Sequence, residues 1–230
     1  MPKKPCQNIL VSRFRTESAA NESFKILRTN LKYYGWTHQA KTLALTSTDP
    51  GEGKSTVAAN LAVSFSQNGK KVILIDADMR IPVQHHIFAV ENRSGFADVL
   101  SGRISLFMAI HPTQLANLWL LTSGTVPYNP SELLGNGKLA TVLDELKPLY
   151  DVILLDCPPV LPVIDTVLIA AVAEGAVLVA REGETDLKRL VAAKRQLAAG
   201  NARLLGVIMN NVRRNKKENR YYHYYHSRHG

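Results

Sequence analysis

Apolar residues along this chain gather in short continuous runs, which are separated by turn residues or by amphipathic stretches. Within each run the apolar residues follow one another and do not alternate with polar ones. Such runs are typical of strands that are covered on both faces in a parallel sheet. We therefore predict an α/β fold, a mostly parallel sheet with helices on both faces. The predicted strands are 42–46, 71–76, 118–122, 152–156, 176–180 and 205–209.

Helical periodicity appears between several of these strands. In the first helical segment, Phe24, Leu27 and Leu31 recur on one face, and Glu22, Lys25 and Arg28 lie on another. Gly69 ends the second helix, because glycine readily takes the left-handed conformation of a helix C-cap. The predicted helices are 17–34, 55–68, 131–148 and 186–199.

The domain organisation follows from where aliphatic residues stop. They are spread over residues 1–212 and are almost absent from residues 213–230. A chain of 230 residues with 46% hydrophobic content suits one α/β domain with a full core. We predict a single domain over 1–212 and a flexible, basic, tyrosine-rich tail over 213–230.

Composition narrows the setting in which the chain works. Cys6 and Cys157 share no metal-type spacing and are interpreted as reduced thiols of a cytoplasmic protein. The N-terminal residues show no signal peptide, and no apolar run reaches the roughly 18 residues of a membrane span. The net charge of +9 attracts polyanions or acidic lipid surfaces. The alternative is a soluble basic protein that has no such partner.

A phosphate-binding loop is predicted between the first strand and the second helix. Gly51 and Gly53 let the backbone N–H groups turn toward phosphate oxygens, and the helix adds its positive N-terminal end. Lys54 can reach the β- and γ-phosphates, and the Ser55 hydroxyl can bind Mg²⁺. The first glycine of the general P-loop pattern is Thr48 here. The predicted ATP-binding residues of the loop are Asp49, Pro50, Gly51, Glu52, Gly53, Lys54, Ser55 and Thr56.

Three aspartates follow predicted strands and complete this site. Asp76 and Asp78 come at the end of the second strand, and Asp156 ends the strand 152–156. The carboxyl ends of parallel strands meet at one edge of a sheet, where ligands bind. With Ser55, these acids can hold Mg²⁺ and accept a proton from a nucleophile. The alternative for each is a cap on the following helix. Which of Asp76 and Asp78 is the base is not visible in the sequence.

Two further residues have two interpretations each. Arg80 could neutralise the charge of a transferred phosphoryl group or pair with a surface acid. Asn210 lies just past the last strand and could bind the adenine edge, since its amide both donates and accepts hydrogen bonds. The alternative for Asn210 is a loop residue without a ligand.

The tail holds half of the eight tyrosines of the chain. Packing within an aliphatic-poor segment does not require them, so we interpret Tyr221, Tyr222, Tyr224 and Tyr225 as phosphoryl acceptors. The tail carries about +5, and each phosphotyrosine adds roughly −1.5 to −2, so three or four would invert its sign. The alternatives are a tail that docks on a partner and an aromatic-basic segment that binds RNA.

Taken together, these residues resemble the bacterial tyrosine kinases of capsule and exopolysaccharide synthesis, of the CpsD/CapB type. The resemblance covers nearly the whole chain. It includes residues 22–30, the loop 50–55, the Walker A′ stretch 73–80, the segment 129–134, and the Walker B stretch 152–159 with Asp165 beyond it. The tyrosine-rich end belongs to the same pattern.

The resemblance implies an ATP-dependent, Mg²⁺-dependent protein-tyrosine kinase with a P-loop fold like that of MinD and ParA. Lys54 and Ser55 would hold phosphate and Mg²⁺, and Asp76, Asp78 and Asp156 would bind the metal and activate the tyrosine. Glu22, Lys25 and Arg28 match an oligomerisation motif whose middle arginine is lysine here, so the fork of two parallel hydrogen bonds is lost there.

The family also implies partners. A membrane protein of the chain-length-determinant type would activate the kinase through its cytosolic end and hold it at the inner face of the membrane. Copies of the chain would form a ring, possibly an octamer. A cognate tyrosine phosphatase and protein substrates complete the expected partners, and no nucleic acid is expected.

Two rival functions use the same fold or the same charge. Partition ATPases of the MinD/ParA type carry a signature lysine five positions before the P-loop lysine, where this chain has Asp49, and they lack the tyrosine cluster. The second rival is a non-catalytic nucleotide-gated adaptor or nucleic-acid binder. Self-labelling on tyrosine distinguishes a kinase from both.

Overall fold

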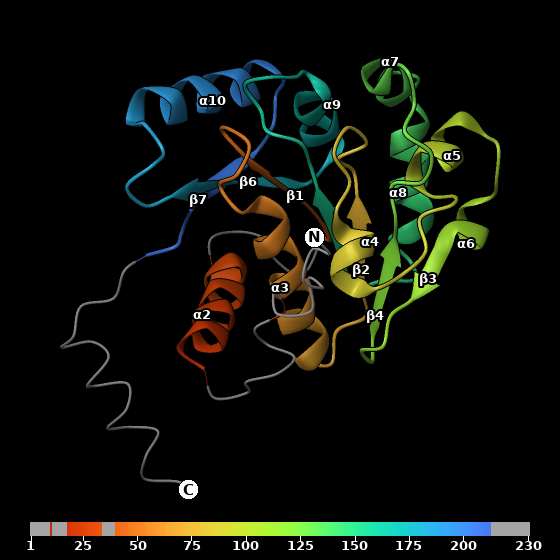
Figure 1. The fold of residues 1–230 in the computed structure, drawn as a ribbon, viewed down its shortest axis with the longest axis horizontal. Helices are drawn as coiled ribbons and strands as arrows, with labels where there is room; N and C mark the ends of the chain where they lie inside the picture. Colours follow the sequence, from red (N-terminus) through yellow and green to blue (C-terminus); the bar gives the residue numbers. More distant parts are fainter. Residues whose placement is uncertain (1–9, 11–17, 34–39, 213–230) are drawn as a thin grey trace, which may run out of the picture.

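The sheet brings together strands that are far apart in the sequence. The computed structural model describes residue 10 and residues 18–33 and 40–212, and these form a seven-stranded sheet in the order β3-β4-β2-β5-β1-β6-β7 (Figure 1). Only β3 runs antiparallel to its neighbour. The strands are β1 (Thr42–Ser47), β2 (Val72–Asp76), β3 (Ile110–Pro112), β4 (Leu118–Leu121), β5 (Val152–Asp156), β6 (Gly175–Arg181) and β7 (Leu204–Asn210).

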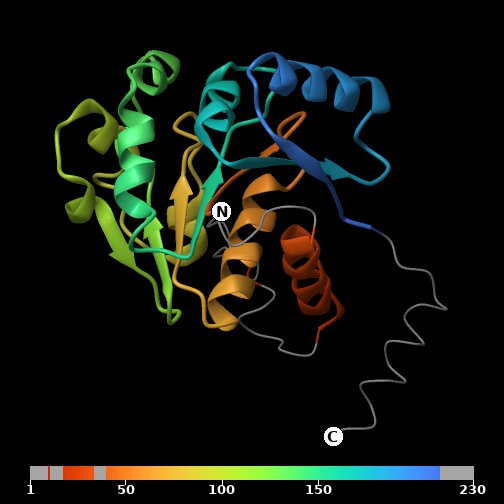
Figure 2. The ribbon, with the colours of Figure 1, turned by 180° about the vertical axis from the view of Figure 1, so that it is seen from behind.

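The helices form a layer on each side of this sheet, which confirms the predicted α/β architecture. Figures 1 and 2 show α2 and α3 on one side and α8, α9 and α10 on the other. The helices are α2 (Ala19–Tyr33), α3 (Lys54–Gln67), α4 (Gln84–Phe88), α5 (Phe96–Ser101), α6 (Leu106–Ala109), α7 (Pro130–Gly135), α8 (Lys138–Leu146), α9 (Asp165–Val172) and α10 (Leu187–Ala199).

Two apolar clusters lie on the two faces of the sheet, and this is why the strands are continuously apolar. In β1, Leu43 and Leu45 pack in the cluster under α2 and α3, whereas Ala44 between them packs in the opposite cluster. Successive strand residues point to opposite faces, so a strand covered on both faces must be apolar at every position.

The prediction of a single helix over 131–148 is wrong. The segment 131–148 forms two helices, α7 and α8, which Asn136 and Gly137 separate. Gly137 has φ of 84°, a left-handed conformation that ends helical geometry, and Asn136 accepts a hydrogen bond from the Lys138 N–H at 3.0 Å. Five short elements, β3, α4, α5, α6 and α9, were not predicted, because three to eight residues carry too little periodicity.

Topology decides which strand ends meet. The central strands are β2, β5 and β1, side by side and parallel, with Asp76 of β2 in register with Asp156 of β5. The loops that follow these three strands therefore share one edge of the sheet. They are the P-loop after β1, the stretch with Asp78 after β2, and the segment after Asp156. In the part of the chain that the structure describes, no helix is long and apolar enough to cross a membrane.

Candidate active site

The P-loop takes a conformation that its glycines permit. Gly51 has φ of 88° and Gly53 has φ of 92°, both in the left-handed region that strains other residues. A Cβ atom at Gly53 would also lie 2.2 Å from Nδ2 of Asn210. The α3 helix begins at Lys54, directly after this loop, so its free N–H groups face the same space.

Glu52 holds the loop together from inside. Its buried carboxylate accepts hydrogen bonds from the Thr48 N–H at 2.7 Å, the Thr48 hydroxyl at 2.5 Å and the Asp49 N–H at 3.1 Å. It also accepts one from the Thr185 hydroxyl at 2.5 Å, beyond β6. The side chain of Glu52 therefore shapes the loop. The donor that Glu52 can offer to ATP is its backbone N–H.

Asp49 is tied to α10. Its carboxylate pairs with both Nε and a terminal nitrogen of Arg189, and the hydrogen bond from Arg189 holds the pKa of Asp49 below its ordinary value. Arg181 donates to the carbonyl oxygen of Gly51 at 3.3 Å. Sequence reasoning did not identify either arginine as part of the loop, because they lie more than 120 residues downstream and only the fold brings them there.

Lys54 lies among the predicted acids. Its Nζ is 2.7 Å from Oδ2 of Asp78, 3.6 Å from Oδ1 of Asp156 and 3.1 Å from the Ser55 hydroxyl. Burial by itself would lower the pKa of Lys54. The Asp156 and Asp78 carboxylates outweigh that effect, so the pKa is raised and the lysine is an ammonium. A fixed positive charge at this edge is what a bound triphosphate requires.

Asp76 and Asp156 are fully buried, and each has one oxygen that accepts no hydrogen bond. Oδ2 of Asp76 accepts from the N–H groups of Val83 and Gln84 at 3.0 and 2.9 Å, while Oδ1 has no hydrogen-bond partner. Oδ1 of Asp156 likewise accepts no hydrogen bond. Burial and the neighbouring Asp156 raise the pKa of Asp76 to about 8. Burial also raises the pKa of Asp156.

The fit of this site to Mg²⁺ depends on a ligand from outside the chain. Among the described residues, no group of three or more His, Cys, Asp or Glu side chains is arranged to hold a metal ion. Mg²⁺, however, is usually held by one or two carboxylates together with phosphate oxygens and waters. The unsatisfied oxygens of Asp76 and Asp156, with Asp78 and the Ser55 hydroxyl nearby, suit that role.

Gln84 is a site residue that sequence reasoning missed. It is buried at the start of α4, and its Nε2 donates to Oδ2 of Asp156 at 2.7 Å and to the carbonyl oxygen of Ser55 at 3.0 Å. One amide therefore links the Walker B acid to the P-loop helix. A glutamine eight residues beyond Asp76 carries no pattern that would have marked it.

Arg80 pairs with a buried acid, and its predicted role toward a transferred phosphoryl group stays a prediction. Its Nε and one terminal nitrogen donate to the two carboxylate oxygens of Asp165, at 2.8 and 3.0 Å. Asp165 is completely buried at the first turn of α9, so the expectation of a surface acid is wrong. The hydrogen bond from Arg80 to Asp165 raises the pKa of Arg80. This fork joins the stretch after β2 to the stretch after β5.

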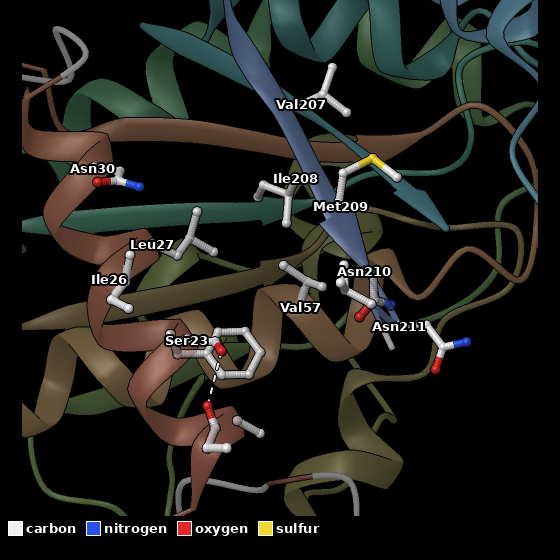
Figure 3. A pocket seen from close by; sticks show the side chains of 14 residues that line it. Ser23, Ile26, Leu27, Asn30, Val57, Val207, Ile208, Met209, Asn210 and Asn211 are labelled. Carbon is white, nitrogen blue, oxygen red and sulfur yellow. Dashed lines mark hydrogen bonds between the residues drawn. The ribbon is translucent and has the colours of Figure 1, made fainter. Parts of the chain in front are cut away.

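Asn210 lines a cavity beside the P-loop. Its Nδ2 donates to the carbonyl oxygen of Glu52 at 3.0 Å. Figure 3 shows the cavity between α2 and β7, with Leu27 of the helix and Ile208 of the strand pointing toward one another. Its volume is about 590 Å³, and Val57 of α3 also lines it. Asn210 contacts the P-loop backbone, so its predicted contact with adenine stays a prediction.

The three predicted oligomerisation residues have different environments. Glu22 and Lys25 pair with each other at 3.1 Å on the surface of α2. Arg28 points inward, where one terminal nitrogen donates to the Ser64 carbonyl and hydroxyl oxygens on α3. Arg28 therefore anchors α2 to the P-loop helix. Tyr221, Tyr222, Tyr224 and Tyr225 lie outside the described residues.

Comparison with known proteins bears on the class of protein. Residues 40–185 match the AAA domain family. The chain is 40% identical over 210 residues to the tyrosine-protein kinase YwqD of Bacillus subtilis (strain 168), covering 91% of this chain and 89% of that one. It is 34% identical to the putative tyrosine-protein kinase CapB of Staphylococcus aureus, covering 96% of this chain and 97% of CapB.

Solved structures give the same result. The chimerical protein CapA2B2 superposes with a TM-score of 0.85 at 33% identity, over 90% of this chain and 91% of that chain. The kinase domain of the Escherichia coli tyrosine kinase ETK gives 0.84 at 28% identity, over 90% and 82%. The MinD protein of Pyrococcus horikoshii OT3, complexed with Mg-ADP, gives 0.66 at 30% identity, over 77% and 73%.

The fold and the site define a P-loop nucleotide-binding protein with a MinD-like sheet. Within that class, the relatives place the chain in the AAA domain family and among the bacterial tyrosine-protein kinases of the CpsD/CapB type. The chain belongs to this family, and it is a protein-tyrosine kinase. The partition-ATPase alternative shares the fold, but its structures superpose less closely and over less of the chain.

Proposed function

We propose that this kinase uses Mg-ATP to phosphorylate the tyrosines of its own C-terminal tail, and that it thereby regulates the synthesis and export of a capsular or extracellular polysaccharide. The observation that carries the proposal is the position of Lys54, which lies within hydrogen-bond reach of Asp78 and close to Asp156 at one edge of the sheet. The names of the relatives support the tyrosine specificity.

Each residue of the site takes one role in this proposal. The P-loop backbone, Lys54 and Thr56 bind the ATP phosphates, and Asn210 and the cavity beside it receive the nucleoside. Ser55, Asp76, Asp78 and Asp156 would hold Mg²⁺, which would neutralise phosphate charge. As a carboxylate, Asp76 also has one buried oxygen free of hydrogen bonds, and it accepts the proton of the attacking tyrosine hydroxyl.

The partners of the kinase follow from the family. A membrane protein of the chain-length-determinant type activates it through a cytosolic segment and keeps it at the inner face of the membrane. Copies of the kinase assemble into a ring through α2, possibly an octamer, and a tyrosine phosphatase reverses the labelling. Arg28 contributes indirectly, because its bond to Ser64 fixes α2 on α3.

The test is a phosphotyrosine blot after the addition of ATP. Lys54→Met should abolish the labelling, because the ammonium that binds the phosphates is lost. The variant with Phe at all four tail tyrosines should lose self-labelling and still bind ATP. Adding the cytosolic peptide of a candidate activator should increase the labelling of the wild-type chain.

Two outcomes would contradict the proposal. Undiminished labelling of Lys54→Met would remove the P-loop from the reaction. Full labelling of the four-Phe variant would place the acceptor elsewhere, while loss of ATP binding in that variant would mean that the tail belongs to the fold.

A further inference from the structure

Helix α10 presents a cationic face that the kinase site does not use. It carries Lys188, Arg189, Lys194 and Arg195, all of them exposed, and no acidic residue within its bounds. Arg189 pairs with Asp49 of the P-loop. Lys188, Lys194 and Arg195 form no ion pair with any residue in the described part of the chain. Three positive charges on this helix therefore remain uncompensated.

The same face exposes aliphatic side chains. Leu187 is 72% exposed and Val191 is 41% exposed, whereas Ala193 and Leu197 on the opposite side are buried against the sheet. Val191 lies three residues after Lys188 and four before Arg195, so these three side chains share one helical face. A surface helix gains nothing in water from exposing leucine and valine beside unpaired cations.

The position of α10 leaves this face open. Figures 1 and 2 show the helix along the outer boundary of the molecule, next to α9 and above β7, with no described element beyond it. A broad, flat partner can approach α10 there without displacing another part of the described fold.

We propose that the outer face of α10 binds the surface of an anionic lipid bilayer. Lys188, Lys194 and Arg195 would contact lipid phosphates, and Leu187 and Val191 would enter the boundary between headgroups and acyl chains. A bilayer surface is the partner that accepts cations and aliphatic groups on one helix face at once. Nucleic acid would use the cations, but it offers no apolar layer to the two aliphatic side chains.

This inference stands apart from the proposed function, because it concerns a surface and not the reaction. Two aliphatic side chains and three cations give weak, salt-sensitive binding, and stable anchoring usually takes two signals. The α10 face would therefore orient a kinase that a second contact also holds at the membrane.

The test uses the full-length chain with its six tail cations replaced by Gln, so that the tail does not bind the vesicles itself. Partitioning is measured by flotation with vesicles of phosphatidylglycerol and phosphatidylcholine in equal parts, and with phosphatidylcholine alone. The six tail cations are Arg213, Arg214, Lys216, Lys217, Arg220 and Arg228.

Replacing Lys188, Lys194 and Arg195 by Gln should weaken partitioning to the anionic vesicles about 100-fold, at roughly a factor of five for each charge near the surface. The matched control replaces three exposed lysines elsewhere, Lys32, Lys71 and Lys138, by Gln. It removes the same net charge and should reduce partitioning only a few-fold, because those charges do not contact the bilayer.

The double variant Leu187→Ser/Val191→Ser should lose most of the binding that persists at high salt, and pure phosphatidylcholine should bind neither the parent chain nor the variants. Equal partitioning of the α10 variant and the charge-matched control would overturn the proposal. Binding of a DNA duplex that depends on the three cations, with no vesicle binding, would overturn it in favour of a nucleic-acid surface. Thermal unfolding of each variant checks that the fold is unchanged.

Discussion

At the residue scale, backbone conformation at the P-loop limits what each position tolerates. Gly53 combines a left-handed φ of 92° with a neighbour that leaves no space for a side chain, whereas Gly51 has a similar φ and nothing within 4 Å of a Cβ. A side chain at position 53 would therefore destabilise the fold in two ways, by backbone strain and by a clash with Asn210. Substitutions can separate these two effects.

We predict that Gly53→Ala lowers the free energy of unfolding by about 2 kcal/mol or more and weakens ATP binding, since both strain and a clash with Asn210 arise. Adding Asn210→Ala should restore part of the stability, because the clashing amide is gone. Gly69→Ala, with φ of 76° and open space around it, is the control and should cost only about 1 kcal/mol. Chemical denaturation measures all three. Equal losses for Gly53→Ala in both backgrounds would show that Asn210 does not limit the loop.

Gln84 is the residue for which the structure adds most to the site. We predict that Gln84→Ala lowers kcat for tyrosine phosphorylation about 10- to 100-fold, because Asp156 loses the donor that orients it. The Kd for ATP should change much less. Gln196→Ala removes a similar side-chain amide whose bond runs to the Val160 carbonyl, and it should leave kcat unchanged. A Gln84→Ala variant with normal kcat would remove this glutamine from the catalytic arrangement.

At the element scale, the start of β1 depends on one carboxylate. Oε2 of Glu174 accepts hydrogen bonds from the N–H groups of Lys41 and Thr42 and from the Thr42 hydroxyl. Burial acts to raise the pKa of Glu174, but the hydrogen bonds from Thr42 and Lys41 outweigh it and the pKa is lowered. The segment just before β6 thus fixes the first residues of β1.

This lowered pKa predicts a pH-dependent stability. The folded state binds the Glu174 proton more weakly than the unfolded state, so the stabilisation is full above the unfolded pKa of about 4.5 and is lost as the pH falls through the folded value. Glu174→Gln should cost about 1–2 kcal/mol at pH 7, and the difference from wild type should be smaller at a pH below the lowered folded pKa. Denaturation at both pH values measures it. Glu184→Gln, in an exposed pair with Arg181, should cost less than about 0.5 kcal/mol at any pH. A constant deficit for Glu174→Gln across this pH range would contradict the assignment.

At the scale of the whole molecule, the strand order assembles the site. Neighbours β2, β5 and β1 are separated by many residues in the sequence, yet their carboxyl ends form one edge. The described apolar clusters that support this arrangement contain no residue beyond Ile208. The predicted boundary between domain and tail, after residue 212, stays a prediction.

The boundary makes a prediction for the whole chain. A chain that ends at Val212 should unfold within about 2 °C of the full-length protein, because residues 213–230 hold no aliphatic side chain that a core would bury. It should also bind ATP normally and lose self-labelling on tyrosine. Thermal unfolding and nucleotide titration measure these properties. A midpoint lower by many degrees would show that residues 213–230 contribute to the fold.

The sequence by itself determined the class of fold and the chemical groups of the site. Continuous apolar strands, the loop around Gly53 and the aspartates at strand ends are local patterns, and each depends only on residues close together in the chain. Short elements such as α9, and the break at Gly137, were not predicted from the sequence, because the residue patterns that mark them are as short as the elements themselves.

Only the tertiary structure decided which groups touch. Gln84 on Asp156, Arg80 on the buried Asp165, Arg189 on Asp49 and Arg28 on Ser64 are contacts whose partners lie between 36 and 140 residues apart. Judged from the sequence alone, each of these side chains could serve several roles, since charge and hydrogen-bonding capacity do not specify a partner. The packing of helices on two faces of one sheet leaves a single partner within reach, and that selects the role.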